Sequence, residues 1–250
     1  MKFAPLPFLN AALLMGACLM AMPLNAAEIK VFSTPAASSA LLEVVPEFER
    51  STGHKVVLDF SNIATTRKRI DAGEAYDVAV VSPKAVEDLV QQGKMAPGAT
   101  LNLGRTGLAM VAKKGTPLPD IRTPEAFRRT LLEAKMVAYS ATGESGIGFM
   151  KVLEKMGITA EMKPRIQASK NAGAAIEAGD ALLAITGVGA ALTYTKLDYV
   201  GPLPAAVQEY VYVGAGVSVD SKAPEAARAL LKYLGDPAVV QVMRSKGLER

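Results

Sequence analysis

Residues 28–60 read EIKVFSTPAASSALLEVVPEFERSTGHKVVLDF, and the rest of the chain repeats their pattern. Short apolar runs predict strands at Glu28–Ser33 and Val56–Phe60, and the amphipathic run between them predicts a helix near Ala37–Thr52. Gly53 follows this helix as its C-cap, and His54 falls in the turn after it. A strand, a helix and a second strand in this order are typical of a sheet covered by helices.

Outward from this unit, apolar runs keep alternating with amphipathic runs. Further strands are expected at Asp77–Val81, Leu108–Ala112, Met136–Tyr139, Ala181–Thr186 and Tyr210–Val213. Further helices are expected at Thr65–Ala72, Pro83–Gln92, Thr123–Glu133, Gly146–Met156, Ala172–Ala178 and Pro224–Leu234. On one of these helices Ile147, Met150 and Leu153 share a face, and on another Leu230, Leu231 and Leu234 are expected to face inward. The predicted fold class is α/β, with mixed sheets flanked by helices and ligands beyond the carboxyl ends of strands.

The N-terminus resembles an export signal. Before Glu28 the chain is almost wholly apolar, and Lys2 is its only charge. This pattern predicts a signal peptide at residues 1–26, cleaved after Ala26 with Ala27 as the second choice, and a periplasmic mature chain. An uncleaved membrane anchor is the alternative, because the apolar segment is long enough to span a bilayer. Cys18 raises the possibility of a lipoprotein, but the residues before it form a poor lipobox.

Composition excludes several classes of function. The chain has 28 basic and 24 acidic residues, and no dense basic stripe predicts a nucleic-acid partner. Cys18, the only cysteine, falls in the predicted signal peptide, so the mature chain has neither a disulfide framework nor a thiol nucleophile. With His54 as the only histidine, Ser/His and Cys/His nucleophile pairs and His- or Cys-built zinc sites are excluded. We therefore expect a protein that is not an enzyme and needs no metal or cofactor, although a Ser/Lys pair or a carboxylate dyad remains open.

Hydroxyl-bearing segments follow several predicted strands at the point where a helix begins. The candidate binding residues there are Ser33, Thr34, Thr65, Thr66, Ser82, Gly143, Ser145 and Gly146. Each segment combines hydroxyls with free backbone N–H groups, where the helix dipole favours negative charge. An ordinary N-cap is the alternative for each segment alone. Because all of them fall at carboxyl ends of strands, we expect a shared anion site.

Two arginines could add positive charge to such a site. Arg105, followed by Thr106, stands just before a predicted strand and could hold a carboxylate with two parallel hydrogen bonds. Arg67 lies in the first turn of a predicted helix. The alternative for Arg105 is a solvated loop arginine.

The mature chain resembles a known family of transport proteins. The segments Ile29–Ser33, Arg69–Val80 and Pro237–Val240 are similar to periplasmic molybdate-binding-type proteins, a branch of the type 2 periplasmic binding proteins. The resemblance implies two α/β lobes, residues 27–107 plus 206–250 and residues 108–205, which close on a ligand like a hinge. It also implies that the loaded protein docks on the membrane permease of an ABC importer.

The chain departs from this family at the expected ligand residues, which indicates a divergent branch. Ala36 stands where the family has its ligand serine, and Ala64 and Thr65 stand where it has a serine run. Thr186 opens the segment in which the family has a ligand tyrosine, and no tyrosine follows before Tyr194. The resemblance therefore leaves the ligand open between a molybdate-type oxyanion and a small organic acid, of which the organic acid better suits the arginines.

These observations predict a monomeric periplasmic receptor that captures a small anion in the cleft between two lobes and delivers it to an ABC importer. One alternative is an envelope adaptor that senses the ligand without transporting it. The other is a hydrolase that uses a Ser/Lys pair or a carboxylate mechanism.

Overall fold

The computed structural model describes residues 26–250. The predicted signal peptide, apart from Ala26, and Cys18 lie outside the described residues. Within residues 26–250, no helix is both long enough and apolar enough to cross a membrane.

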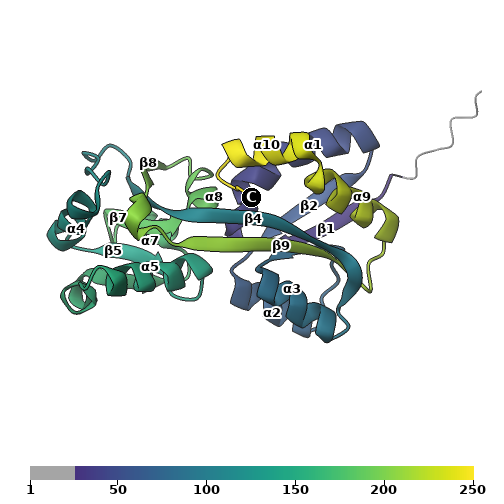
Figure 1. Ribbon diagram of the computed structural model, residues 1–250, viewed down its shortest axis with the longest axis horizontal. Helices are drawn as coiled ribbons and strands as arrows, with labels where there is room; N and C mark the ends of the chain where they lie inside the picture. The colour runs from purple at the N-terminus through teal and green to yellow at the C-terminus, as the bar shows by residue number, and fades with distance from the viewer. Residues whose placement is uncertain (1–25) are drawn as a thin grey trace, which may run out of the picture.

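Strands and helices alternate along the chain (Figure 1). The strands are β1 (Glu28–Ser33), β2 (Lys55–Phe60), β3 (Val78–Val81), β4 (Met95–Lys113), β5 (Val137–Ser140), β6 (Ile166–Ser169), β7 (Leu183–Gly187), β8 (Leu197–Pro202) and β9 (Tyr210–Ser218). The α-helices are α1 (Ser38–Thr52), α2 (Ile63–Asp71), α3 (Pro83–Gln91), α4 (Pro124–Glu133), α5 (Glu144–Lys155), α6 (Thr159–Met162), α7 (Ala172–Glu177), α8 (Val188–Ala191), α9 (Pro224–Gly235) and α10 (Pro237–Ser245). Three 3-10 turns are η1 (Pro35–Ala37), η2 (Lys163–Arg165) and η3 (Ala205–Val207).

The strands follow one another in the order β2-β1-β3-β9-β4-β7-β5-β6, with β8 paired to β4. Strand β1 is parallel to β2 and β3, whereas β9 is antiparallel to both β3 and β4. We call the part built on β1, β2, β3 and β9 the first half and the part built on β5, β6, β7 and β8 the second half. Strand β4 pairs in both, and Figure 1 shows β4 and β9 running along the elongated molecule from one half to the other.

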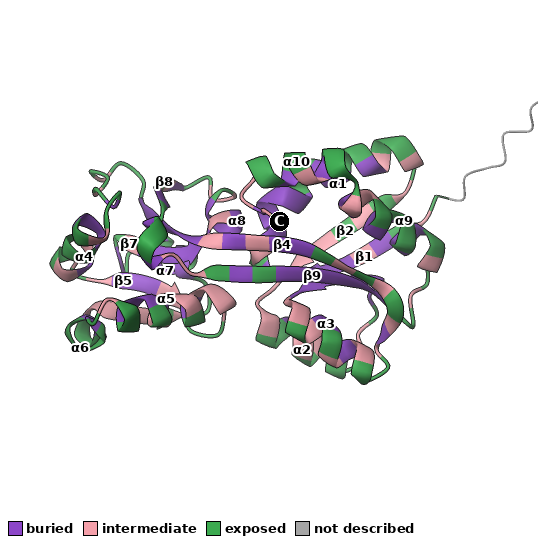
Figure 2. Ribbon diagram, in the orientation of Figure 1, coloured by how far each residue is buried: buried purple, intermediate pink, exposed green. Residues whose placement is uncertain are grey.

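Each half has its own hydrophobic core, as the buried strands in Figure 2 illustrate. Because side chains alternate along a strand, Ile29 and Val31 of β1 pack under α1, α9 and α10, while Phe32 packs on the other face with residues of α2 and α3. In the second half, Phe127 and Phe149 belong to a core under α4, α5 and α6, and a smaller cluster lies under α7 and α8. The prediction of an α/β fold with a mixed sheet flanked by helices is confirmed.

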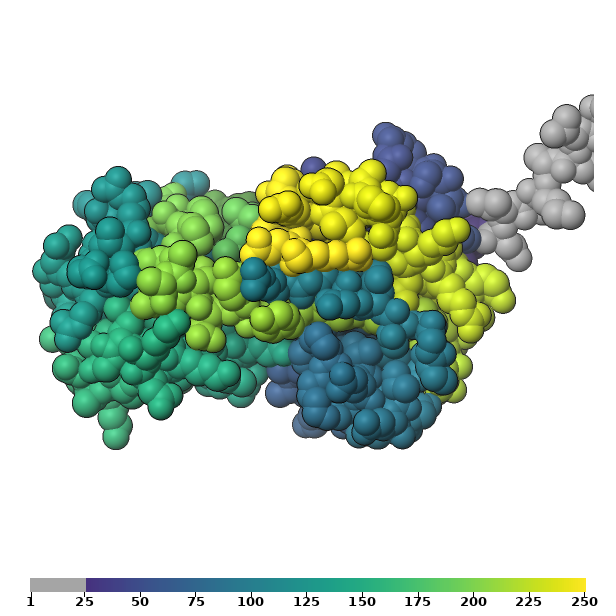
Figure 3. All heavy atoms as spheres, viewed as in Figure 1, coloured from purple at the N-terminus to yellow at the C-terminus, as the bar shows by residue number. Residues whose placement is uncertain are grey.

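Residues near the C-terminus lie over the middle of the molecule, against β4 (Figure 3). The backbones of Arg105 and Glu249 exchange hydrogen bonds of 2.7 and 2.9 Å between N and O atoms. Gly104 makes this approach possible, because a Cβ there would lie 2.2 Å from the Glu249 carbonyl oxygen. The φ of Gly104, 124°, also favours glycine.

Several elements differ from the sequence-based expectation. The strand expected at Leu108–Ala112 is the end of the much longer β4. Bulges in the earlier part of β4 interrupt the alternation of buried and exposed side chains that would have predicted a strand there. On α5 the buried residues include Phe149, Val152 and Leu153, whereas the side chain of Ile147 is exposed. Val200–Pro202 belong to β8, which pairs with β4, and the chain then runs from the second half to the first along β9.

Candidate functional site

A cavity opens between the two halves, where the carboxyl ends of β1, β2, β5 and β7 meet helix starts. Its volume is about 400 Å³. Lining residues come from both halves, and among them are the N-cap residues of five helical segments: Thr34, Asn62, Gly143, Asn171 and Gly187. Because the first N–H groups of a helix have no partner inside it, a cavity bordered by helix starts is rich in hydrogen-bond donors.

The five N-caps leave different numbers of donors free. The side chains of Asn62 and Asn171 accept hydrogen bonds from their own helices, at 2.9 Å from Thr65 N and at 2.9 Å from Gly173 N. Gly143 and Gly187 have no side chain that could do the same. The first N–H groups of α5, a helix of 12 residues, are therefore not capped by its N-cap side chain and can bind an anion.

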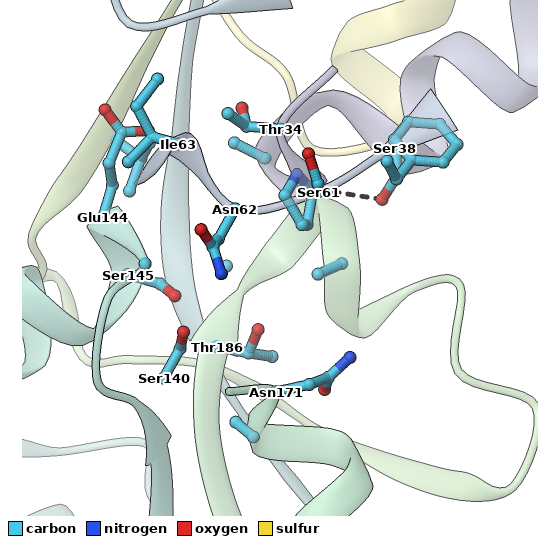
Figure 4. Close-up of a pocket in the computed structure, with 18 of the residues that line it drawn as sticks. Thr34, Ser38, Ser61, Asn62, Ile63, Ser140, Glu144, Ser145, Asn171 and Thr186 are labelled. Atoms are coloured by element: carbon cyan, nitrogen blue, oxygen red, sulfur yellow. Dashed lines mark hydrogen bonds between the residues drawn. The ribbon is translucent and has the colours of Figure 1, made fainter. Parts of the chain in front are cut away.

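Neutral polar side chains converge on the same space. Figure 4 shows Asn62 of the first half pointing toward Ser140, Ser145 and Thr186 of the second half. Thr34 is 3% exposed, and its hydroxyl has no hydrogen-bond partner within the described residues. Buried hydroxyls are nearly always hydrogen-bonded, so Thr34 is a donor left for a ligand.

One carboxyl group and one ammonium group border this neutral set. Glu144 is the first residue of α5 and lines the same cavity, and in Figure 4 its carboxyl group points away from Ser140 and Ser145. Burial raises the pKa of the Glu144 carboxyl, and the neighbouring Ser82 hydroxyl opposes this shift. Lys170 lies on the loop before α7, with an exposed side chain.

The remaining wall is apolar and aromatic. Leu42, Phe60, Ile63 and Val211 contribute hydrocarbon surface. Tyr194 also lines the cavity; its hydroxyl donates to Asn171 Oδ1 over 3.2 Å, and burial raises its pKa. The cavity therefore offers hydrogen-bond donors to anionic groups and an apolar surface to a carbon skeleton.

The structure brings some of the sequence-predicted residues into the cavity. Those that line it are Thr34, Ala36, Thr65, Gly143, Ser145 and Thr186. Others lie directly behind the lining. Ser33 is buried and donates to the Thr34 carbonyl; Thr66 is buried and hydrogen-bonded to Ser61 over 2.7 Å. Gly146 packs so closely on the end of β5 that a Cβ would lie 1.8 Å from the Ser140 carbonyl oxygen. Ser82 caps α3 and neighbours Glu144.

The predicted cations and two further residues lie outside the lining. Arg67 Nη2 donates to Gln92 over 2.6 Å, and its Nε lies 3.4 Å from Asp71. Arg105 stacks on the Tyr210 ring at 4.0 Å, and its Nε lies 3.6 Å from Glu249. The structure therefore does not place either arginine against a ligand in this cavity. Thr106 is buried in β4, and Ala64 is exposed on α2.

The chain matches a family model over nearly its whole described length. The model is that of the bacterial extracellular solute-binding proteins, and it matches residues 29–249. This protein belongs to that family. The resemblance to molybdate-binding-type proteins is confirmed as well.

Two curated relatives of this solute-binding protein carry different names. The aconitate isomerase of a Pseudomonas species is 32% identical over 95% of this chain and 95% of its own length. The molybdate-binding protein ModA of Azotobacter vinelandii is 23% identical over 93% of this chain and 94% of its own length. The solved periplasmic molybdate-binding protein of the same organism superposes with a TM-score of 0.76 at 19% identity, over 89% of this chain and 99% of that chain.

The isomerase relative corrects one expectation. We expected a protein without enzymatic activity, and a relative 32% identical over 95% of this chain that is named an enzyme contradicts this. The physical reason is that low numbers of His and Cys residues exclude only some kinds of enzyme. Too few His and Cys residues exclude nucleophile pairs and zinc sites, but an isomerisation by proton transfer needs only a well-placed acid or base. Within residues 26–250, no group of three or more His, Cys, Asp or Glu side chains is placed to hold a metal ion.

Sequence reasoning missed much of the cavity of this solute-binding protein. The missed polar residues include Ser38, Ser61, Asn62, Glu144, Lys170, Asn171 and Tyr194. Asn62 and Asn171 carried a usable signal, since asparagine is a preferred N-cap. Applied to Asn62, this preference places the start of α2 at Ile63, two residues before the expected start. Asn171 follows β6, a strand that the sequence did not reveal.

Proposed function

We propose that this solute-binding protein binds a small polycarboxylate of the aconitate class between its two halves and interconverts the isomers of that acid. The observation that supports the proposal is that helix-start donors, the Glu144 side chain and apolar residues line one cavity. The isomerase relative supports the choice of substrate and reaction.

The donors suit carboxylates. The open start of α5, the unpaired Thr34 hydroxyl and the converging Asn62 and Ser145 side chains all offer hydrogen bonds to anionic oxygens. A polycarboxylate also has a carbon skeleton, for which Leu42, Phe60 and Ile63 provide surface. A tetrahedral oxyanion has no skeleton and would leave this wall uncovered, so the organic acid fits the whole cavity better.

In this proposal Glu144 is the base that moves a proton on that skeleton. In aconitate, the methylene carbon carries one carboxyl group and is bonded to a carbon of the double bond that carries another. When Glu144 removes a methylene proton, the C–H electron pair is shared with the double bond. Return of a proton to the former vinylic carbon shifts the double bond and lets the product take the other geometry. Burial raises the pKa of Glu144 toward neutral pH, which improves a carboxylate as a base.

The test is the interconversion of cis- and trans-aconitate, followed by proton NMR in deuterated water with the purified mature chain. We expect catalysed conversion with solvent deuterium entering the methylene carbon. Glu144→Gln should lower kcat by about 10²–10⁴-fold, as removal of a general base does, and should leave ligand affinity within severalfold.

Glu154→Gln is the matched control, since Glu154 is an exposed carboxyl group on the same helix, α5. It should leave turnover unchanged. Conversion that survives Glu144→Gln would remove Glu144 from the mechanism. Tight aconitate binding without conversion would instead favour a role as a receptor. Binding of molybdate but not of aconitate would favour a molybdate-type oxyanion as the ligand.

We propose a second role as the receptor of an ABC importer, which family membership favours. Here the chain acts as a periplasmic monomer after removal of residues 1–26. Residues 27–107 plus 206–250 form one lobe and residues 108–205 the other, and the lobes close on the ligand about β4 and β9. Loss of ligand uptake by cells that lack this chain, restored equally by wild type and Glu144→Gln, would support transport as a role separate from isomerisation.

A further inference from the structure

Lys170 is the one basic side chain among the described residues that line the cavity. It lies between β6 and α7, next to the N-cap Asn171. Its backbone is held from the neighbouring strand β5: Ser140 Oγ donates to the Lys170 carbonyl over 3.4 Å, and Ala141 N donates to Ser169 O over 2.9 Å. A fixed backbone therefore carries a long, exposed side chain at the edge of the cavity.

The Lys170 ammonium group has no carboxylate partner within residues 26–250, whereas the two arginines once expected in the site do. Arg67 is paired with Asp71, and Arg105 with Glu249. Lys170 is thus the cation that the fold leaves uncommitted beside the helix-start donors. The other charged side chain in the lining, Glu144, repels an anionic ligand whenever it is ionised.

Neutral donors and a cation select different features of a ligand. Backbone N–H groups and hydroxyls bind any well-placed carboxylate, whatever the total charge of the molecule. An ammonium at the edge adds attraction only for a carboxylate that reaches it. We infer that Lys170 holds the additional carboxylate of a tricarboxylate and so favours tricarboxylates over dicarboxylates. This inference rests on the proposed function for the class of ligand.

The test compares two saturated acids that cannot isomerise. Tricarballylate is succinate with one added carboxymethyl arm, so the pair differs only in the group assigned to Lys170. Calorimetric titration of the mature wild type should show tighter binding of tricarballylate. Lys170→Gln should weaken tricarballylate about tenfold and succinate by less than about twofold, as loss of one partially exposed charge pair predicts.

Lys170→Arg should keep the preference within about threefold, because it retains the charge. Lys135→Gln is the matched control, since Lys135 is an exposed lysine of the second half outside the lining, and it should change neither affinity. An unchanged ratio in Lys170→Gln, or an equal loss for both acids, would overturn the inference while the proposed function stands. A wild type that binds neither acid would overturn both.

Discussion

Glu144 shows how a single residue acquires its chemistry from the tertiary structure. In the sequence it is one of 24 acidic residues, without a motif around it. In the fold it opens α5 at the edge of the cavity, and burial raises its pKa above the ordinary value of 4.5. Desolvation disfavours the charged form, so this burial costs stability once the Glu144 carboxyl is ionised.

This cost predicts a pH-dependent effect of Glu144→Gln. The raised pKa means that the folded state holds the proton more tightly than the unfolded state. Protonated Glu144 therefore stabilises the folded state relative to ionised Glu144. This stabilisation is present in full below the pKa of Glu144 in the unfolded state, and it is lost as pH rises through the pKa of Glu144 in the folded state. Glutamine stays neutral throughout, so the variant should gain in Tm relative to wild type as pH rises from about 4 to 8. Thermal melts across this range measure it; a constant difference would show that Glu144 does not titrate abnormally.

Arg67 and Arg105 illustrate the opposite case at the same scale. Their residue type suggested a carboxylate clamp, but their partners come from distant positions that sequence spacing does not reveal. Gln92 is 25 residues from Arg67, and Tyr210 reaches Arg105 only through the pairing of β4 with β9. An arginine beside a predicted site is therefore weak support for a ligand contact until the neighbouring strands are known.

At the scale of elements, the N-cap residue of α7 contributes both to the stability of the second half and to the lining of the cavity. Asn171 Oδ1 accepts hydrogen bonds from the backbone N–H groups of Gly173 and Ala174 and from the Tyr194 hydroxyl. Gly173 leaves room for that ring, because a Cβ there would lie 2.7 Å from Tyr194 Cζ. One side chain thus caps the helix and positions an aromatic residue of the lining.

Asn171→Ala should therefore affect both properties. Loss of an N-cap costs about 1 kcal/mol of stability. Release of Tyr194 should also weaken tricarballylate about fivefold, the effect of one lost hydrogen bond. Urea unfolding and calorimetric titration measure the two effects.

Asp236→Ala is the matched control, because Asp236 caps α10 through a 2.8 Å bond from Ala238 N and lies outside the cavity lining. It should lose similar stability and no affinity. Equal affinity losses in both variants would mean that the cap acts only through general destabilisation.

At the scale of the whole molecule, the two halves touch through η1 and α8. A Cβ on Gly189 would lie 2.2 Å from the Ala36 carbonyl oxygen, and Ser38 Oγ donates to the Gly189 carbonyl over 3.0 Å. Ser38 Oγ also lies 2.8 Å from the Pro35 carbonyl oxygen, within the same turn. This arrangement of the halves therefore depends on glycine at position 189.

Gly189→Ala should weaken ligand binding without removing a ligand contact. Overpacking of this kind costs roughly 1–3 kcal/mol, and if the cost falls on the arrangement in which the halves touch, affinity should fall by about 5- to 150-fold. Calorimetry measures the loss, and small-angle scattering should show a more open ligand-bound form. Gly235→Ala, where the nearest atom to a Cβ is 3.7 Å away, is the control and should bind normally.

Local sequence patterns determined where several helices and strands of this protein lie along the chain. The apolar period located β1, α1, α3 and α9 within a residue or two, because each element buries one face and its sequence records that face. The same reasoning placed hydroxyls such as Thr34 and Ser145 at helix starts, since a helix start follows from local capping preferences.

Only the tertiary structure decided which of these helix starts share a cavity and which charges face it. Glu144, Lys170 and Tyr194 reach one space because β5, β6 and β7 lie side by side, and Thr34 meets them from the other half. Strand order and the approach of η1 to α8 are contacts between residues far apart in the chain, which no local period encodes. The sequence alone therefore determined the fold class and placed several helix starts at the carboxyl ends of strands, whereas packing between the halves decided which side chains line the cavity.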